Sequence, residues 1–330
     1  MKYRTIGTDP KTRREVSVLA LGTMHFGTAT DEATSFAILD RYAEAGGTFI
    51  DTADNYAYWT GSQGGESEEL LGRWRHNRGV GEEIVIATKL GARPLAPGTS
   101  FTSNAEGLSA RAIRESSQRS RDRLGVPRLD LLYAHIDDPS VPMADTVGAF
   151  AALVAEGTVG LLGVSNHWAW QVERARSLAA AAGLPGYEVL QYQHSYLRPR
   201  TDLAGGRYPD GSPGLADGDL LSYLRAEPQL TMVAYASLMR GGYVRPDKLR
   251  ASEFAEFEHP GTPARLAALR DVAKETGATA GQVVLAWLIG GDIPVIPVIG
   301  ASSVAQLDEN LAAADLELTT EQRTTLDTAC

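Results

Sequence analysis

The chain has 330 residues, of which 43% are hydrophobic and 22% charged, and its formal net charge is −10 at pH 7. This composition is typical of a globular protein. The acidic balance argues against a nucleic-acid partner or an anionic membrane surface, because both require clustered lysine and arginine. The single cysteine, Cys330, excludes an intramolecular disulfide framework, and no cysteine–histidine cluster has the spacing of metal ligands, so we expect no metal.

The N-terminal segment has no feature of a secretory signal, because seven charged residues fall within its first 15 positions and no apolar stretch follows. The longest apolar run, 283–289, is too short to span a bilayer. A chain with so little cysteine fits a reducing compartment. We therefore expect a cytoplasmic protein without a membrane partner, and the sequence leaves its oligomeric state open.

Short apolar runs alternate with longer amphipathic segments along the chain. The sequence predicts a β-hairpin with strands at 3–6 and 16–18. Eight further strands are expected at 19–21, 48–50, 84–87, 129–133, 159–164, 189–192, 230–234 and 295–299. The helices are expected at about 31–45, 66–76, 109–124, 143–156, 169–182, 217–226, 262–276, 280–290, 303–313 and 320–329. This alternation predicts one α/β domain over 1–330, a closed (β/α)8 TIM barrel with an N-terminal β-hairpin and extra C-terminal helices.

An open, doubly wound sheet is the competing fold, but it usually begins with a glycine-rich G-x-G-x-x-G turn. The first strand here leads into LGTMHFG at 21–27, which does not match. Helix starts are expected at Thr262-Pro263 and at the capping boxes that begin at Ser303 and Thr319. Two connections, 195–216 and 239–261, are longer than a barrel needs, and we expect these active-site-face loops to include a lid.

Polar residues follow the expected strands, where barrel enzymes build their active sites. In chain order they are Asp51 with Tyr56 five residues later, Lys89, His135, Ser165 with Asn166, Gln191 and Gln193, Tyr235 and Gly300. A single polar residue at a strand end is most often a cap or a solvated tip, and Asp54 and Asn55 are interpreted as ordinary turn formers. The succession of such residues on neighbouring strands is the functional signal.

Four of these residues could act together to protonate the oxygen of a carbonyl group as it is reduced. Tyr56 is protonated at pH 7, since a free tyrosine has a pKa of about 10. A lysine ammonium, here Lys89, stabilises the tyrosinate, lowers the pKa of the phenol and makes it a better acid. A carboxylate such as Asp51 can keep that lysine charged, and His135 can orient the substrate oxygen.

Seven segments carry a resemblance to a known family, and in chain order they are LGTMHFG (21–27), FIDTADNY (49–56), GESEELLG (65–72), IATK (86–89), DLLYAH (130–135), GVSN (163–166) and EN (309–310). Over nearly the whole chain they resemble the aldo-keto reductase superfamily of NAD(P)H-dependent oxidoreductases, of bacterial type. The resemblance implies a catalytic tetrad of Asp51, Tyr56, Lys89 and His135. It also implies an NADPH bound in extended form, without a Rossmann turn, and a small-molecule carbonyl substrate.

The resemblance further implies which residues bind the cofactor. Ser165, Asn166 and Gln191 would hold the nicotinamide carboxamide, with Gln193 as the alternative to Gln191, and Tyr235 would stack on the ring. The remaining implied contacts are Gly22, Thr23, Met24, Ala236, Ser237, Leu238, Gly300, Ser302, Gln306, Glu309 and Asn310.

One departure from the family concerns the 2′-phosphate of NADPH. Members that prefer NADPH usually carry Lys or Arg early in the last barrel loop, but residues 300–306 contain neither. Ser302, Ser303 and Gln306 can hydrogen-bond a phosphate but cannot neutralise it, and Ser303 with Gln306 also fits a plain helix cap. We expect NADPH to be preferred, and NADH remains possible.

Candidate substrate-pocket residues fall in the loops that follow the strands, and they are His25, Tyr58, Trp59, Trp168 and His194. Each could instead pack a loop or lie in solvent. His194 stands where the family usually has a tyrosine, if Gln191 is the matching glutamine.

The sequence favours an enzyme that reduces an aldehyde or ketone, or oxidises the alcohol in reverse. One alternative is a cofactor-binding regulatory subunit resembling the β subunits of potassium channels. Another is a barrel isomerase or aldolase that uses Lys89, although Tyr56 and His135 would then have no role. The substrate itself is not identified, because barrel pockets are built from variable loops.

Overall fold

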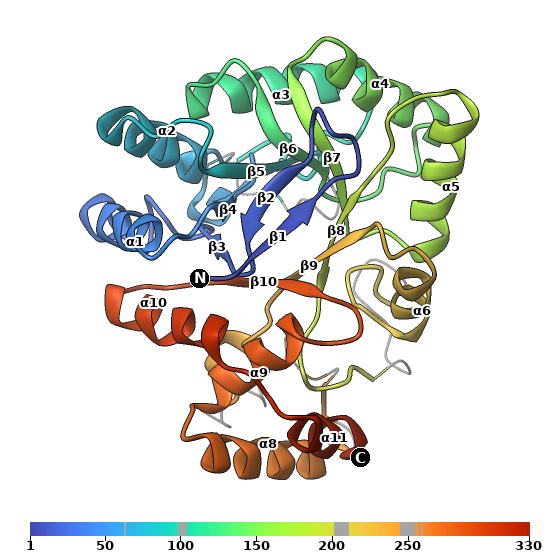
Figure 1. Ribbon diagram of the computed structural model, residues 1–330. Coiled ribbons are helices and arrows are strands. Elements are labelled where there is room, and N and C mark those ends of the chain that lie inside the picture. Colours follow the sequence, from blue (N-terminus) through green and yellow to red (C-terminus); the bar gives the residue numbers. More distant parts are fainter. Residues whose placement is uncertain are drawn as a thin grey trace.

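The computed structural model describes residues 1–62, 64–97, 99, 104–200, 211–244, 255, 257, 258 and 260–330. Eight parallel strands close into a barrel surrounded by helices, which confirms the predicted fold (Figure 1). The strands are β3 (Ala20–Gly22), β4 (Phe49–Asp51), β5 (Val85–Leu90), β6 (Leu129–Ala134), β7 (Val159–Ser165), β8 (Val189–Gln193), β9 (Thr231–Tyr235) and β10 (Val295–Ile299). The last strand closes the barrel on the first, with Val298 opposite Ala20.

Two apolar layers hold the barrel together, because its parallel strands are covered on both faces. All six residues of β5 and all seven of β7 are buried. The interior layer includes Phe49, Leu131 and Ile296, whereas the layer between strands and helices includes Trp74 and Phe150. The rigid scaffold that results fixes the carboxyl ends of the strands, where the site lies.

An antiparallel hairpin of β1 (Tyr3–Ile6) and β2 (Arg14–Ser17) covers the amino end of the barrel (Figure 1). Ile6 and Val16 are fully buried and belong to the interior apolar layer. Gly7, between the two strands, has φ +83°, and a Cβ there would lie 2.6 Å from Leu161 Cδ2. The hairpin thus closes one end and leaves the opposite end for the site.

The helices surround the barrel close to their predicted positions. They are α1 (Glu32–Glu44), α2 (Glu66–Arg78), α3 (Ala110–Leu124), α4 (Met143–Ala155), α5 (Ala169–Ala181), α6 (Gly218–Ala226), α8 (Thr262–Thr276), α9 (Ala280–Ile289), α10 (Val304–Leu311) and α11 (Thr320–Thr328). Short 3-10 turns occur at η1 (Tyr58–Thr60), η2 (Met239–Gly241) and η4 (Ala312–Asp315). Across the described part of the chain, none of the helices has the length and apolarity needed to cross a membrane.

The helix caps agree only partly with the sequence. The capping box of Thr319 with Gln322 is confirmed. Ser303 accepts a hydrogen bond from the Gln306 N–H, but the Gln306 side chain bonds Ser302 instead, so the expected reciprocal box is wrong. The expected cap at Thr262 is also wrong, because its hydroxyl donates to the Phe257 carbonyl and Gly261 occupies the cap position.

The two long connections leave the carboxyl ends of β8 and β9. In the first, Gln193 and Leu215 form an isolated bridge, which brings the two ends of the 195–216 connection together. Residues 201–210, on which the expected lid depends, lie outside the described residues, as does much of 245–259.

Candidate active site

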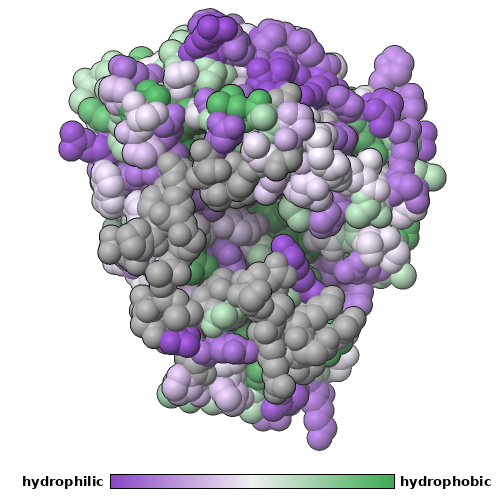
Figure 2. Space-filling model, turned by 180° about the vertical axis from the view of Figure 1, so that it is seen from behind, coloured by the Kyte–Doolittle hydropathy of each residue, from purple (hydrophilic) through white to green (hydrophobic). Residues whose placement is uncertain are grey.

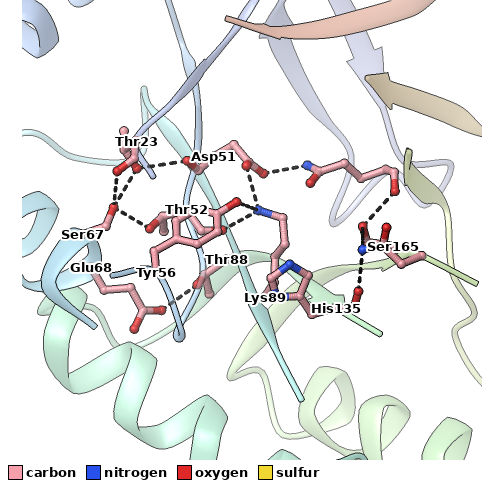
Figure 3. A network of polar contacts seen from close by, with 12 residues as sticks. Thr23, Asp51, Thr52, Tyr56, Ser67, Glu68, Thr88, Lys89, His135 and Ser165 are labelled. Atoms are coloured by element: carbon pink, nitrogen blue, oxygen red, sulfur yellow. Dashed lines mark hydrogen bonds and ion pairs between the residues drawn. The ribbon is translucent and has the colours of Figure 1, made fainter. Parts of the chain in front are cut away.

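Three neighbouring strands bring the four tetrad residues together at the carboxyl end of the barrel (Figure 3). Asp51 is the last residue of β4, and Tyr56 lies in the loop that follows it. Lys89 is the second-last residue of β5, and His135 directly follows β6. Because parallel strands end at the same edge, residues far apart in sequence converge there.

The Lys89 ammonium lies at the centre of the tetrad. Its Nζ donates to Asp51 Oδ2 at 2.7 Å, to the Thr52 carbonyl at 2.7 Å and to Tyr56 Oη at 3.0 Å. These bonds use all three ammonium donors. Lys89 is fully buried and Asp51 is 2% exposed, so the ion pair is sealed from bulk water.

Backbone and hydroxyl contacts hold the tetrad loop in place. The Thr52 N–H donates to the Ala87 carbonyl, which ties the loop to β5. Thr23 Oγ1 donates to the Asp51 carbonyl at 3.0 Å, and Ser67 Oγ donates to the Thr23 carbonyl at 2.9 Å. Ser67, on α2, lies within the GESEELLG segment, but the sequence analysis did not single it out.

The charges around the tetrad set its protonation states. Burial lowers the pKa of Lys89, but Asp51 and Tyr56 outweigh burial, so the pKa is raised and Lys89 stays an ammonium. Burial raises the pKa of Tyr56 more than Lys89 lowers it, so the net direction is opposite to the sequence expectation. Burial and then Lys89 lower the pKa of His135 to about 3, which makes its imidazole neutral.

His135 faces Tyr56 edge-on, with the ring centroids 6.3 Å apart. Its Nδ1 is buried and has no hydrogen-bond partner among the described residues. A neutral imidazole with an unused buried nitrogen beside the phenol is suited to contacting a small polar group.

A second polar group continues from the tetrad across β7 and β8. Gln191 Nε2 donates to Asp51 Oδ1 at 2.7 Å, and Ser165 Oγ donates to the Gln191 carbonyl at 2.8 Å. Asn166 Nδ2 donates to the His135 carbonyl at 2.9 Å, and Tyr235 Oη donates to Asn166 Oδ1 at 2.8 Å. The four residues expected to bind the nicotinamide ring therefore form one network with the tetrad.

The structure distinguishes the two strand-β8 glutamines. Gln191 points to Asp51, whereas the Gln193 backbone pairs with Gly214 and Ala216 of the following loop. Gln191 is therefore the glutamine that the fold brings to the tetrad.

The residues expected to line the cofactor phosphates lie in the loops after the paired strands β9 and β10. Ala236 has φ +53°, a left-handed conformation that is unusual for a residue other than glycine. Ser237 is buried and donates to the Ala234 carbonyl, and Leu238 follows it directly before η2. Asn310 Nδ2 donates to the Gly300 carbonyl at 3.2 Å, which joins α10 to the loop after β10.

Several other expected cofactor residues have contacts within the protein. Gly22 pairs in register with Asp51, and Thr23 and Met24 follow it at the same barrel end. Ser302 donates to Gln306 Oε1 through both its N–H and its hydroxyl. The Glu309 carbonyl accepts a hydrogen bond from Gln282 Nε2 of α9.

Three of the candidate pocket residues form an aromatic group next to the tetrad loop. The His25 and Trp59 rings lie 5.9 Å apart and the Tyr58 and Trp59 rings 5.4 Å apart, both edge to face. Trp59 is 45% exposed, so part of the group is open to solvent. The face behind the hairpin, seen in Figure 2, is hollowed near its centre, where hydrophobic and polar surface are both visible.

The other two candidates lie elsewhere. The His194 ring lies 6.1 Å from that of Trp287 on α9, and burial lowers the pKa of His194 to about 4. His194 is thus packed against a helix rather than gathered with the tetrad. Trp168 precedes α5, and its ring lies near Gly211 of the 195–216 connection.

Comparison with known proteins places this site in a family. A model described as the Aldo/keto reductase family matches residues 18–330. The chain belongs to the aldo-keto reductase family. It is accordingly an NAD(P)H-dependent oxidoreductase of the kind that reduces carbonyl groups.

Individual relatives of this aldo-keto reductase agree with the assignment. Norsolorinic acid reductase stcV of Emericella nidulans is 32% identical over 318 residues, covering 93% of this chain and 76% of the relative. Aryl-alcohol dehydrogenase GME11368 of Pestalotiopsis microspora is 29% identical over 322 residues, 94% of this chain and 78% of the relative. A solved structure of the thermostable aldo-keto reductase Tm1743, in complex with the inhibitor epalrestat, covers 100% of both chains at 24% identity, with a TM-score of 0.74, and shows the same fold.

Two features of this aldo-keto reductase were missed or misread in the sequence. Burial lowers the pKa of the His25 imidazole, and the positive charge of Arg240, in η2, lowers it further. Arg240 and Met239 both have left-handed φ, at +50° and +49°. Asp54, interpreted as an ordinary turn former, does lie in a turn, but its side chain is fully buried within the loop between Asp51 and Tyr56.

Proposed function

We propose that this aldo-keto reductase reduces an aldehyde or ketone, with Tyr56 as the proton donor and NADPH as the preferred cofactor. The observation that carries the proposal is the buried Lys89 ammonium, in hydrogen-bond contact with both Asp51 and Tyr56. When bound, the cofactor supplies the hydride. The protein residues position the substrate and deliver the proton.

The proton sits on Tyr56 Oη, beside the Lys89 ammonium. As negative charge develops on the substrate oxygen, transfer of this proton leaves a tyrosinate that Lys89 stabilises at hydrogen-bond distance. Asp51 keeps the lysine charged in a buried site. His135, as a neutral imidazole, would hydrogen-bond the same substrate oxygen and orient it toward the phenol.

The residues of the second network fit a nicotinamide ring. Ser165, Asn166 and Gln191 provide hydroxyl and amide groups of the type that bind a carboxamide, and they adjoin the tetrad. Tyr235 supplies an aromatic ring at the same end of the barrel. We also propose a cytoplasmic location, because the sequence contains a single cysteine, which fits a reducing compartment.

The test is a panel of aldehydes and ketones assayed by the loss of reduced-nicotinamide absorbance, with NADPH and NADH in parallel. We expect turnover of carbonyl compounds, faster with NADPH. Absence of turnover on every carbonyl and every alcohol in the reverse direction, despite cofactor binding, would contradict the proposal and favour a regulatory role.

The loop that would bind the 2′-phosphate makes a prediction about cofactor choice. Because residues 300–306 hold no cation, Ser302→Arg should lower the Kd for NADPH about fivefold and leave that for NADH nearly unchanged, the effect of an exposed ion pair worth roughly 1 kcal/mol. Fluorescence titration with both cofactors measures this. Ser177→Arg on α5 adds the same charge elsewhere and should change neither Kd, and an equal gain in both variants would show a nonspecific charge effect.

The aromatic group of His25, Tyr58 and Trp59 suggests which carbonyl compounds fit best. We propose aromatic aldehydes or ketones, whose rings can pack against Trp59; a relative with the name of an aryl-alcohol dehydrogenase supports this class. Trp59→Ala should raise KM for an aryl aldehyde about threefold to tenfold, equivalent to an aromatic pair of roughly 0.5–1.5 kcal/mol. KM for a short aliphatic aldehyde should change much less, and an equal rise for both would remove the aromatic preference.

A further inference from the structure

Asp54 is a buried acid that the proposed mechanism does not use. It lies between Asp51 and Tyr56, and its side chain is fully buried. Its backbone N–H donates to the Lys89 carbonyl at 3.0 Å, so this residue connects the loop carrying Tyr56 to the strand carrying Lys89. Within the described residues, neither carboxyl oxygen of Asp54 receives a hydrogen bond from an N–H group or a hydroxyl.

Another acid, Glu106, lies close enough to the Asp54 carboxyl to share a side-chain hydrogen bond with it. Burial raises the pKa of Asp54 well above its usual range, and the charge and hydrogen bonding of Glu106 raise it further. Glu106 Oε2 accepts from Arg119 at 2.6 Å and Oε1 from Ser116 Oγ at 2.7 Å. A hydrogen bond between two carboxyl groups requires that one of them carry a proton. Because both Glu106 oxygens already accept hydrogen bonds, from Arg119 and Ser116, Asp54 is the better placed of the two to be the donor.

The other charged groups around Asp54 pair with one another. Glu68, on α2, accepts from Thr88 Oγ1 at 2.6 Å and from Arg123 Nη1 at 3.1 Å (Figure 3 shows the Thr88 bond). Arg123 Nη1 also donates to the Asp54 carbonyl at 3.3 Å. Arg93 Nη1 lies 3.9 Å from Glu106 Oε2. The described part of the chain therefore contains no ion pair to the Asp54 side chain, although Arg93, Arg119 and Arg123 are all close by.

We propose that Asp54 is a positioning residue, whose protonated carboxyl donates a hydrogen bond to Glu106 and thereby holds the Tyr56 loop in register with Lys89. The loop is then fixed from both sides. Its backbone is bonded to β5, and its side chain is bonded to Glu106, which α3 anchors through Arg119 and Ser116. The kinetic consequence rests on the proposed carbonyl reduction, whereas the consequence for stability does not.

The test compares Asp54→Asn with Asp54→Ala, using the full-length protein. Asn is neutral and can still donate to Glu106, so Asp54→Asn should keep kcat within about threefold of wild type. Asp54→Ala loses the donor, and kcat should fall roughly 10- to 100-fold, as expected when reacting groups are misplaced, with KM and the cofactor Kd nearly unchanged. A merely structural role would not produce two of these results: a kcat that is kept in Asp54→Asn, and a kcat that falls in Asp54→Ala while KM and the cofactor Kd stay the same.

A second measurement follows thermal unfolding as a function of pH, and it needs no substrate. A raised pKa in the folded protein gives stability that is present at low pH and lost as pH rises through that pKa. Asparagine does not titrate, so Tm of Asp54→Asn minus Tm of wild type should increase as pH rises. Glu106→Gln should reduce the same pH-dependent component, because the contribution of Glu106 to the raised pKa is lost while that of burial remains. Asp122→Asn, an exposed acid on α3, should leave it unchanged.

The outcomes separate the two proposals. If Asp54→Asn is as damaging as Asp54→Ala and its Tm deficit grows as pH rises, Asp54 is ionised and the inference is overturned. If Asp54→Ala retains full kcat, the pair does not position the loop. If wild type reduces no carbonyl compound but the Tm of Asp54→Asn minus that of wild type increases as pH rises, the proposed function is wrong. The inference that Asp54 is protonated is then retained.

Discussion

Tyr56→Phe should bind the nicotinamide cofactor with wild-type affinity and lose about 10²- to 10⁴-fold in kcat/KM for carbonyl reduction, the range for general acid catalysis. Phenylalanine keeps the ring and its packing against His135 and removes only the hydroxyl that lies 3.0 Å from Lys89 Nζ. Steady-state kinetics and fluorescence titration of the cofactor measure the two effects separately.

Tyr3→Phe is the matched control, because Tyr3 is exposed and donates to the Gly46 carbonyl in the hairpin region, far from the tetrad in sequence and at the opposite barrel end. It should retain full activity. Turnover by Tyr56→Phe within a few-fold of wild type would exclude Tyr56 as the proton donor.

Lys89→Met should have the largest combined effect, because it removes both the partner of Tyr56 and the partner of a buried carboxylate. We expect a loss of activity similar to that of Tyr56→Phe. We also expect unfolding stability to fall by about 3–5 kcal/mol, the usual cost of leaving one member of a buried ion pair unpaired. The Asp51 side chain then keeps the hydrogen bond from Gln191 Nε2 but has lost the ammonium that balances its charge.

The double variant Lys89→Met with Asp51→Asn separates these two effects. Removing the unpaired charge should restore most of the stability, measured by denaturant unfolding, while activity stays lost. Lys274→Met, which removes an exposed lysine from α8, should change neither quantity. Recovery of activity in the double variant would show that Lys89 acts only by stabilising the fold.

The barrel and the tetrad could be predicted from the sequence because both depend on local patterns. Apolar runs of strand length alternate with amphipathic helices, and polar residues follow the strands directly. Once the strands are parallel neighbours, Asp51, Lys89 and His135 must meet at one edge. The strand-end pattern also gave Ser165, Asn166 and the two glutamines Gln191 and Gln193, but their grouping around a nicotinamide ring came from the family resemblance. The choice of Gln191, which donates to Asp51, required the structure.

Features that depend on contacts between distant segments were not predictable in this way. Asp54 has the sequence context of an ordinary turn, but its side chain is fully buried. The charged groups that act on it, Glu68, Glu106 and Arg119, belong to other segments of the chain. His194 follows β8 at the active-site end, but its ring lies against that of Trp287 on α9. The raised pKa of Tyr56 likewise depends on the depth of burial, which the residue types alone do not specify.

The pH dependence of single-turnover carbonyl reduction, followed by cofactor oxidation with enzyme in excess over substrate, tests most directly whether Tyr56 is the acid. An acid must be protonated to act, and the pKa of Tyr56 lies above its usual value of about 10. The rate should therefore be flat from roughly pH 6 to 9 and fall only as pH rises toward the tyrosine pKa. Burial and Lys89 lower the pKa of His135 to about 3, so a histidine acid would give a rate that keeps rising tenfold per unit as pH falls through the neutral range. A rate that rises in this way as pH falls, in wild type and also in Tyr56→Phe, would contradict the assignment of Tyr56 as the acid.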